Sequence, residues 1–539
     1  MRKRSLLLLT PVLALTSLSM TSCGGGREMK PDVYDADGNL LISLRNLYFN
    51  DYTETANDVY LRQLQDDFKV KLSFQSYSWN NWETQVTGAI NAGNLTDVFH
   101  ANIDSYNFAN TYKFWAEEEM IKPLPSDLNK WPNIKKMLDH TSNVDKLYVN
   151  GKLYGLPIAK DTTDYDTSFS PFTYIYRRDW AKKWGVYKEN DVYTWDEFET
   201  LLEKFKTELA STSRYALGDV EWGYPSIVNF YKQVPHCYAY DEASQKYVNN
   251  YLTDDYIKGL NKSKSFKTSG YYYPGQNSAQ DGKLNTEYYS NQIGILYENL
   301  SYTNFEALKK QLKISNASVT GFDVNEATAI MKIKAPSDSM HANKFVLEGT
   351  DNWFSMTFFD FLISDKKQEK ILDIIDYLLS EEGTLFSVYG IEGYDYIVDP
   401  TTHEIELIPE AWPEDPQTHE KAAKINGAKT LRYMASLGYD TLTYDPLTNK
   451  ESVAYLKAWE EEMKDALSHN QLDVLKERKD VMWLTSNQKA RYSGIMRTNA
   501  LGTVMNYIYG TNGVVTLDDY KSNFGYPWAE VLAEINSVI

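Results

Sequence analysis

The residues that most often carry out enzymatic chemistry are scattered in this sequence. The histidines stand at no spacing that would bring two of them to one metal ion. No His-Glu-x-x-His helix, Gly-x-Ser-x-Gly turn or Walker A loop is present. Cys237 lies beside His236, but adjacent side chains seldom point at one another, so we interpret Cys237 as a structural thiol. The sequence predicts no catalytic residue, no metal site and no cofactor.

Carboxylates are abundant, and they leave one enzymatic alternative open. A glycosidase needs two opposed carboxyl groups in a cleft, one of them with a raised pKa. The chain has 74 acidic residues, and nothing in their spacing singles out such a pair. Glu117–Glu119 and Glu381–Glu382 are runs that solvated helix surface explains. We therefore expect a protein that is not an enzyme, with a glycan-active enzyme as the alternative.

The N-terminus has the form of a secretory signal. Arg2, Lys3 and Arg4 precede an apolar run over residues 5–20, which is shorter than a membrane-spanning helix, and small residues follow it up to Cys23. The segment MTSC resembles the lipobox of bacterial lipoproteins, although a methionine stands where leucine is usual. In that interpretation Cys23 is lipidated and the three glycines after it begin a flexible tether. Cleavage without lipidation is the alternative.

Charge and aromatic content narrow the possible partners. Without the three basic leader residues, 52 Lys and Arg face 74 Asp and Glu, a formal charge of −22. A chain this acidic is a poor ligand for nucleic acid and is repelled by anionic lipid headgroups, so a membrane location requires the anchor. Tyr, Trp and Phe make up 14% of the residues. Most must pack in cores, but an excess of Tyr and Trp also suits stacking against sugar rings.

Strand and helix patterns alternate along the first part of the chain. Residues 39–49, 69–77 and 95–101 alternate as strands, and residues 53–68 and 81–94 between them are predicted helices. This spacing indicates βαβ units and a mainly parallel sheet. Ligands of such sheets bind beyond the carboxyl ends of the strands.

Two later helices carry their own end signals. A helix is predicted over residues 194–206, where Thr194 and Glu197 have the spacing of a capping box. A second is predicted over residues 364–383, with Gly383 at the position of its C-cap. The last 140 or so residues have a mainly helical pattern.

Four segments together resemble one protein family. Residues 91–124 include NAGNLTDVFHA and end in IKPL, residues 150–161 read NGKLYGLPIAKD, and residues 174–206 include YIYRRDWAKKWGV and YTWDEF. Residues 389–400 read YGIEGYDYIVDP. These motifs and their order resemble the bacterial extracellular solute-binding proteins of family 1, especially long lipoprotein-type members of Gram-positive bacteria. Thr96 replaces a proline that is usual in that family.

The resemblance implies an α/β fold with two lobes, a type II periplasmic-binding-protein-like clamshell whose ligand cleft lies between the lobes. It places a return crossing near residues 335–344 and a final crossing near Tyr389–Gly390. The expected organisation is a signal peptide over 1–22, a lipidated N-terminus and tether over 23–38, a first lobe over 39–160 and 336–389, and a second lobe over 161–335 and 390–539.

The same resemblance implies a monomer that captures an extracellular solute, most often an oligosaccharide, and delivers it to an ABC permease at the outer face of the cell membrane. A ligand-sensing or adhesion receptor on this scaffold is a further alternative. Sugar sites combine aromatic platforms with amide and carboxylate groups. The loops with that mixture contain our candidate ligand-binding residues, Asp51, Tyr52, Tyr77, Trp79, Asp104, Tyr106, Asp161, Trp222, Tyr224, Asn299, Tyr302, Trp353, Glu392 and Tyr394.

Overall fold

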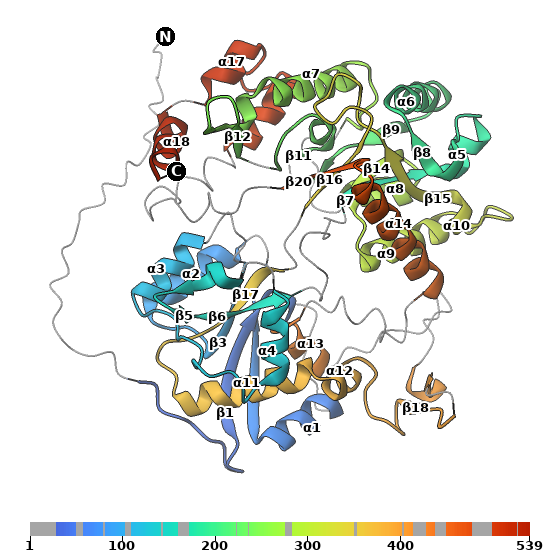
Figure 1. Ribbon diagram of the computed structural model, residues 1–539. Helices are drawn as coiled ribbons and strands as arrows, with labels where there is room; N and C mark the ends of the chain where they lie inside the picture. The colour runs from blue at the N-terminus through green and yellow to red at the C-terminus, as the bar shows by residue number, and fades with distance from the viewer. Residues whose placement is uncertain are drawn as a thin grey trace, which may run out of the picture.

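The protein consists of two lobes, each built on a five-stranded sheet with helices around it (Figure 1). In the view of Figure 1 the first lobe, coloured mainly blue to yellow, lies below the second. The computed structural model describes residues 29–49, 58–78, 81–102, 109–141, 144–159, 172–221, 224–235, 237–274, 283–349, 353–401, 404–412, 427–436, 449–476, 499–524 and 526–538.

The sheet of the first lobe has the strand order β2-β1-β3-β17-β6. β1, β2 and β3 are parallel to one another, as the sequence predicts, while β17 runs antiparallel to both β3 and β6. The strands are β1 (Leu40–Asn46), β2 (Val70–Ser76), β3 (Val98–Ala101), β6 (Gly155–Ala159) and β17 (Trp353–Phe359). All except β17 therefore end at one edge of the sheet, and β17 begins there.

Helices cover both faces of this sheet. The predicted helices are confirmed as α1 (Val59–Phe68), whose N-cap Asp58 accepts a hydrogen bond from the backbone N–H of Leu61, and α2 (Trp82–Ala92). Apolar residues at every second position of β1 are buried, because alternate strand residues face the core. Further helices of this lobe are α3 (Ala109–Glu117), α4 (Pro132–Asp139), α11 (Asp365–Leu379), α12 (Glu381–Val388) and α13 (Gly427–Arg432), and the short strands β4 (Tyr148–Val149) and β5 (Lys152–Leu153) form a hairpin.

The predicted helix over 364–383 is wrong at its end. The helix ends at Ser380, which is both the C-cap of α11 and the N-cap of α12. Gly383 therefore lies inside the second helix and is not a C-cap. The glycine is required for a different reason. A Cβ atom at Gly383 would lie 1.9 Å from the carbonyl oxygen of Tyr377, because α12 starts directly against the end of α11.

The sheet of the second lobe has the order β8-β15-β7-β14-β9. β7 runs antiparallel to its neighbours β14 and β15, which in turn pair in parallel with β9 and β8. The strands are β7 (Phe172–Arg177), β8 (Val192–Tyr193), β9 (Tyr215–Gly218), β14 (Ile293–Asn299) and β15 (Thr328–Ile333). The carboxyl ends of four strands and the amino end of β7 therefore share one edge.

The helices of the second lobe include the one predicted from its capping box. In α6 (Trp195–Leu209) the hydroxyl of Thr194 accepts the backbone N–H of Glu197, and the Glu197 carboxylate accepts the backbone N–H of Thr194. Trp195 packs in the core, with its ring 5.1 Å from that of Phe230. The other elements around this sheet are α5 (Arg178–Lys183), α8 (Lys283–Tyr289), α9 (Tyr302–Ser315), α10 (Val324–Ala327), α14 (Lys450–Ser468) and the 3-10 helix η5 (Ser226–Phe230).

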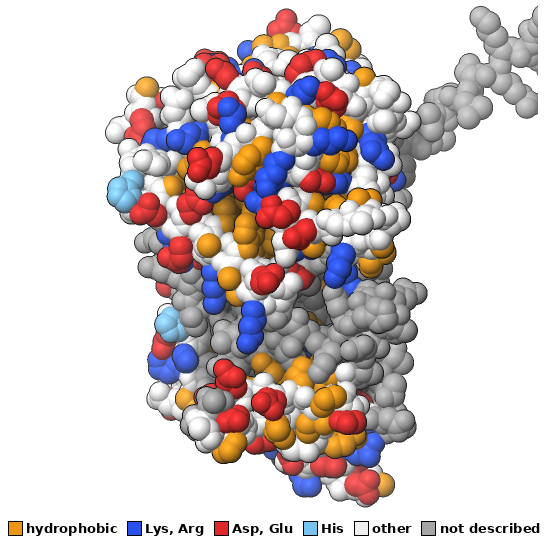
Figure 2. Space-filling view, turned by 90° about the vertical axis from the view of Figure 1, so that its right-hand side faces the viewer, with side chains coloured by type: hydrophobic (Ala, Val, Ile, Leu, Met, Phe, Trp, Pro, Cys, Tyr) orange, Lys and Arg blue, Asp and Glu red, His pale blue; other side chains and the backbone are white. Residues whose placement is uncertain are grey.

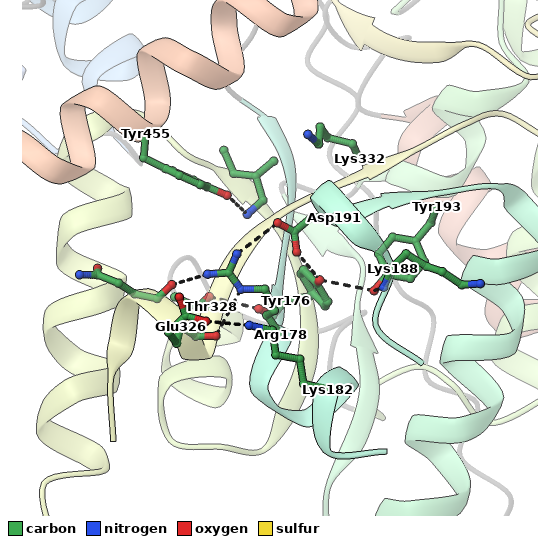
Figure 3. A network of polar contacts seen from close by, with 12 residues as sticks. Tyr176, Arg178, Lys182, Lys188, Asp191, Tyr193, Glu326, Thr328, Lys332 and Tyr455 are labelled. Atoms are coloured by element: carbon green, nitrogen blue, oxygen red, sulfur yellow. Dashed lines mark hydrogen bonds and ion pairs between the residues drawn. The ribbon is translucent and has the colours of Figure 1, made fainter. Parts of the chain in front are cut away.

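A buried polar network joins four of these elements at the edge where β7 ends (Figure 3). The hydroxyl of Tyr176 donates to Asp191 at 2.5 Å, and the guanidinium of Arg178 pairs with the other oxygen of that carboxylate at 3.3 Å. Arg178 also donates to backbone carbonyls of α10. The hydroxyl of Tyr455, on α14, accepts the backbone N–H of Ile330 at 2.8 Å. The network fastens α5, α10 and α14 to the sheet.

The C-terminal elements extend the second lobe. α17 (Leu517–Ser522) and α18 (Tyr526–Val538) pack with α7 (Asp254–Thr268) and with the hairpin of β12 (Tyr238–Asp241) and β13 (Lys246–Asn249). The thiol of Cys237 is buried in this cluster, in agreement with a structural role.

The described part of the chain passes from one lobe to the other three times. β6 ends at Ala159 in the first sheet, and β7 begins the second sheet at Phe172. β16 (Phe345–Glu348) packs with the second lobe, and β17 starts at Trp353 in the first. Ser436 bridges to Ala159 in the first lobe, and α14 follows in the second.

These connections differ from the expected lobe boundaries in two places. β16, expected in the first lobe, pairs with β20 (Leu472–Leu475) and packs against α14. α13, expected in the second lobe, lies in the core of the first. The hairpin of β18 (Tyr396–Val398) and β19 (Ile405–Leu407) also packs beside the end of α12 in the first lobe. Each assignment depends on pairing between residues far apart in sequence, which local motifs do not encode.

The first described residues are docked on the first lobe, although we expected a tether over residues 23–38. The backbone N–H of Lys30 donates to the carbonyl of Leu362, and its ammonium pairs with Asp360 at 2.5 Å. The hydroxyl of Ser364 donates to Asp32, and Lys366 donates to the hydroxyl of Tyr34. This contact lies at the edge where β17 ends, which is the edge opposite the crossings.

Candidate functional site

The two sheet edges that carry the interlobe connections are the natural place for a ligand site. β6 ends at one edge and β7 begins at the other, and Gly349 and Trp353 are only four residues apart. Four residues of extended chain span at most about 14 Å, so the end of β16 lies close to the start of β17. Each edge collects carboxyl ends of parallel strands, the position where open α/β sheets bind ligands.

A pocket opens at this edge of the second lobe. Its volume is about 470 Å³, part of which is open to solvent. It lies where β7 begins beside the end of β14, and η5, β15, β16 and α14 form the remaining walls. Its lining residues are Phe172, Thr173, Tyr174, Ser226, Asn229, Phe230, Tyr297, Met331, Lys332, Ile333, Phe345, Val346, Leu347, Glu348, Trp459 and Met463.

The pocket combines aromatic faces with a few fixed polar groups. The rings of Phe172 and Tyr297 come from paired strands and lie 6.0 Å apart between centroids. The amide of Asn229 donates to the hydroxyl of Tyr297 at 3.1 Å, which holds the phenol in place. Apolar rings with oriented amide and hydroxyl groups are what a pyranose or furanose needs, since its faces are apolar and its rim carries hydroxyls.

Charged groups in the pocket walls are paired with one another. Glu348 accepts a hydrogen bond from the buried ammonium of Lys232 at 2.8 Å, and Lys232 also donates to the carbonyl of Pro235. Lys332 pairs with Glu462 at 2.6 Å. Buried charges that are paired in this way are held in position, because separating them would leave an uncompensated charge. The described walls therefore offer a ligand oriented dipoles and neutral pairs.

A carboxyl group lies beneath the pocket, on the residue that follows β9. Asp219 is fully buried and accepts hydrogen bonds from the hydroxyls of Tyr174, Ser226 and Tyr272, the last at 2.8 Å. Burial raises the pKa of Asp219 to about 7, although these donors oppose the shift. Tyr174 and Ser226 also line the pocket, so Asp219 touches the site through them.

Half of the predicted ligand residues cannot be placed. Those outside the described residues are Asp51, Tyr52, Trp79, Asp104, Tyr106, Asp161 and Trp222, and the lipidation candidate Cys23 is also among them. Tyr224 begins the short strand β11 (Tyr224–Pro225), which pairs with β10 (Val220–Glu221).

Four predicted residues lie at the two facing edges. Tyr77 follows β2 and is buried, with the guanidinium of Arg45 5.0 Å from its ring centroid. Trp353 starts β17 and is also buried. Asn299 ends β14, where its side chain accepts the backbone N–H of Ser301. Tyr302 starts α9, and its hydroxyl accepts the backbone N–H of Asn449. These contacts give all four structural roles, and their predicted contact with ligand stays a prediction.

Glu392 and Tyr394 are not brought to these edges. Both are exposed in the turn before β18, and Tyr394 is 62% accessible. The β18–β19 hairpin lies on the outer flank of the first lobe, at the lower right of Figure 1. The turn is fastened to α1, since Asp395 accepts a hydrogen bond from the hydroxyl of Tyr60 at 2.9 Å.

Sequence reasoning missed most of the pocket residues. Asn299 and Tyr297 lie two positions apart on β14, and the strand-end signal identified only the first. Phe172 lies opposite Asn299 because β7 pairs antiparallel with β14, and no local pattern indicates that pairing. Phe172 and Tyr297 would have been found if aromatic residues had been selected near both the beginning and the end of each predicted strand.

Within the described residues, no group of three or more His, Cys, Asp or Glu side chains is placed to hold a metal ion. None of the helices described is both long and apolar enough to cross a bilayer. On the face shown in Figure 2, acidic and basic side chains are interspersed over both lobes.

Several solved structures have the same fold. The sequence matches no family model and no curated relative. An EF-hand mutant of the Streptococcus pneumoniae substrate-binding protein FusA, in complex with fructo-nystose, matches with a TM-score of 0.64 and 15% identity over 92% of this chain and 98% of its own. A human-milk-oligosaccharide (HMO) binding protein from Bifidobacterium longum infantis matches with a TM-score of 0.63 and 15% identity over 93% and 98%.

A third example is NgtS, the N-glycan transport solute-binding protein of Streptococcus pneumoniae, with a TM-score of 0.55 and 14% identity over 92% of this chain and 97% of its own. The fold is thus the two-lobed, type II periplasmic-binding-protein-like fold of extracellular solute-binding proteins, as the sequence motifs implied. The match extends over nearly the whole of both chains in each case.

Proposed function

We propose that the protein is a solute-binding protein of an ABC importer, that it belongs to the family its motifs resemble, and that it captures an oligosaccharide between its lobes. The observation that carries this proposal is the pocket at the edge of the second sheet, where the rings of Phe172 and Tyr297 adjoin the amide of Asn229. The structural neighbours that bind fructo-nystose, HMO or N-glycans support the same class of ligand.

The proposed location follows from the leader. A lipid on Cys23 would hold the protein at the outer face of the cell membrane, beside the permease that receives the ligand. The acidic composition is consistent with a need for such an anchor, because a mature chain with a formal charge of −22 has little affinity of its own for an anionic bilayer. Mass spectrometry of the native N-terminus tests the anchor, and an unmodified Cys23 or cleavage elsewhere would contradict it.

Thermal melting against a ligand panel tests the sugar. The panel holds kestose, a chitin oligosaccharide, a milk oligosaccharide and an N-glycan, with an alginate oligosaccharide as acidic comparison and short peptides as another class. A ligand at 100 times its Kd stabilises the folded state by about 2.7 kcal/mol, which a melting curve resolves. Stabilisation by peptides and by none of the sugars would refute the proposal.

Two variants connect that result to the pocket. Tyr297→Ala removes the aromatic face and is expected to weaken binding of the identified sugar about fivefold, since a stacked ring contributes about 1 kcal/mol. Tyr394→Ala, on the exposed turn of the first lobe, is the matched control and should bind as the wild type does. Hydrolysis of a bound glycan that disappears on mutation of one carboxylate would favour the enzyme alternative instead.

A further inference from the structure

The floor of the pocket is built from two hydroxyls that share one buried acceptor. Tyr174 lies on β7 and Ser226 begins η5, and the two hydroxyl oxygens are in hydrogen-bond contact with each other. Both donate to the same oxygen of Asp219, at 3.3 Å from Tyr174. The second carboxylate oxygen accepts from Tyr272, whose hydroxyl is 2.8 Å from that of Ser263.

The protonation state of Asp219 determines whether the hydroxyls of Tyr174 and Ser226 act as donors or as acceptors toward a ligand. A hydroxyl has one proton and two acceptor lone pairs. When the carboxyl group is ionised it can only accept, so the protons of Tyr174 and Ser226 are directed at it or at each other. Each oxygen then keeps lone pairs that can accept a hydrogen bond from a group in the pocket that these two residues line. When Asp219 is protonated, it donates one hydrogen bond itself. One neighbouring hydroxyl then accepts that bond and can turn its own proton away from the carboxyl group.

We propose that Asp219 is a positioning residue for the pocket, which orients the hydroxyls of Tyr174 and Ser226 as acceptors so that the site selects a ligand hydroxyl as donor. This inference rests on the proposed function of the pocket. Asp219 itself does not line the pocket and acts through the two hydroxyls.

The described groups that donate hydrogen bonds to Asp219 are neutral. Ile227 donates its backbone N–H to the carboxyl group, and burial holds the pKa of Asp219 near 7, so its protonation changes under ordinary conditions. The phenols of Tyr174 and Tyr272 titrate well above their usual range because they are buried. The charged side chains of the elements around it are paired, namely Lys232 with Glu348, Lys262 with Glu199 and Lys332 with Glu462.

The test compares affinity with pH in three proteins. Calorimetry measures binding of whichever panel sugar stabilises the wild type, at pH 5.5 and pH 8.5. We expect the wild type to bind about fivefold more tightly at the higher pH, a difference that corresponds to one reoriented hydrogen bond. Asp219→Asn keeps the shape and always carries a donor, so it should bind as the wild type does at pH 5.5 and show no dependence on pH.

Asp191→Asn is the matched control. Asp191 is also a buried aspartate that accepts a tyrosine hydroxyl, but it lies in the network at the opposite edge of the same sheet (Figure 3). It should keep the pH profile of the wild type even if it lowers stability. A sugar that binds with the same pH profile in wild type and Asp219→Asn overturns this inference alone. If no sugar binds at either pH, the proposed function fails and the inference fails with it.

Discussion

At the scale of single residues, the buried carboxyl group of Asp219 has a consequence for stability that needs no ligand. Its pKa is raised by burial to about 7, whereas an aspartate in the unfolded chain titrates near 3.8. Between these two values the folded state holds a proton that the unfolded state has lost. Stability therefore falls as the pH rises from about 4 to about 7, and this loss is complete above pH 7.

We expect the difference in unfolding free energy between wild type and Asp219→Asn to shrink by up to about 4 kcal/mol between pH 4 and pH 7, since each pKa unit corresponds to about 1.4 kcal/mol. Urea unfolding of both proteins at several pH values measures this difference. Asp191→Asn serves again as the buried control. A difference between wild type and Asp219→Asn that stays constant over this range would contradict the raised pKa.

At the scale of elements, the junction of α11 and α12 depends on packing that helix-end motifs in the sequence do not predict. Gly383 has no room for a Cβ atom, because the carbonyl of Tyr377 is 1.9 Å from that position. Gly383→Ala should destabilise the protein by about 1 to 3 kcal/mol, since the backbone of one of the two helices must shift.

Gly88→Ala is the control with the opposite sign. Gly88 is exposed in the middle of α2 and nothing lies within 4 Å of its Cβ position, so alanine should raise stability by up to about 1 kcal/mol. Thermal unfolding of both variants measures the two shifts. Equal stability changes in the two variants would mean that helix propensity alone determines the effect of alanine, with no contribution from the packing of α12 on α11.

The elements that could be predicted are those with a complete local signal. α1, α2, β1 and β2 follow from periodicity, and α6 from periodicity and its capping box. The antiparallel pairing of β17 with β3 could not be predicted, because it joins residues about 260 positions apart, such as Phe359 and Val98. The pocket has the same origin. It joins Phe172 to Met463, and only a three-dimensional arrangement brings them together.

At the scale of the whole molecule, the arrangement of two lobes with three connections predicts closure around a ligand. A ligand that contacts both edges stabilises a closed state through interactions that an open state lacks. Small-angle scattering should show a smaller radius of gyration with the panel sugar than without it. Tyr297→Ala at the same sugar concentration should stay at the unliganded value, and an unchanged radius in the wild type at saturation would contradict closure.

The docked segment at Lys30 determines how a pull on the N-terminus is distributed. A force that enters ahead of Met29 meets the ion pair with Asp360 and the contacts with Leu362 and Ser364, all on the first lobe. These contacts lie at the edge of the first sheet that is opposite the three connections. A force on the N-terminus is therefore transmitted to the first lobe and not through the connections. With the N-terminal attachment proposed above, the first lobe is the one held in place, and the second lobe is free to move without displacing the point of attachment.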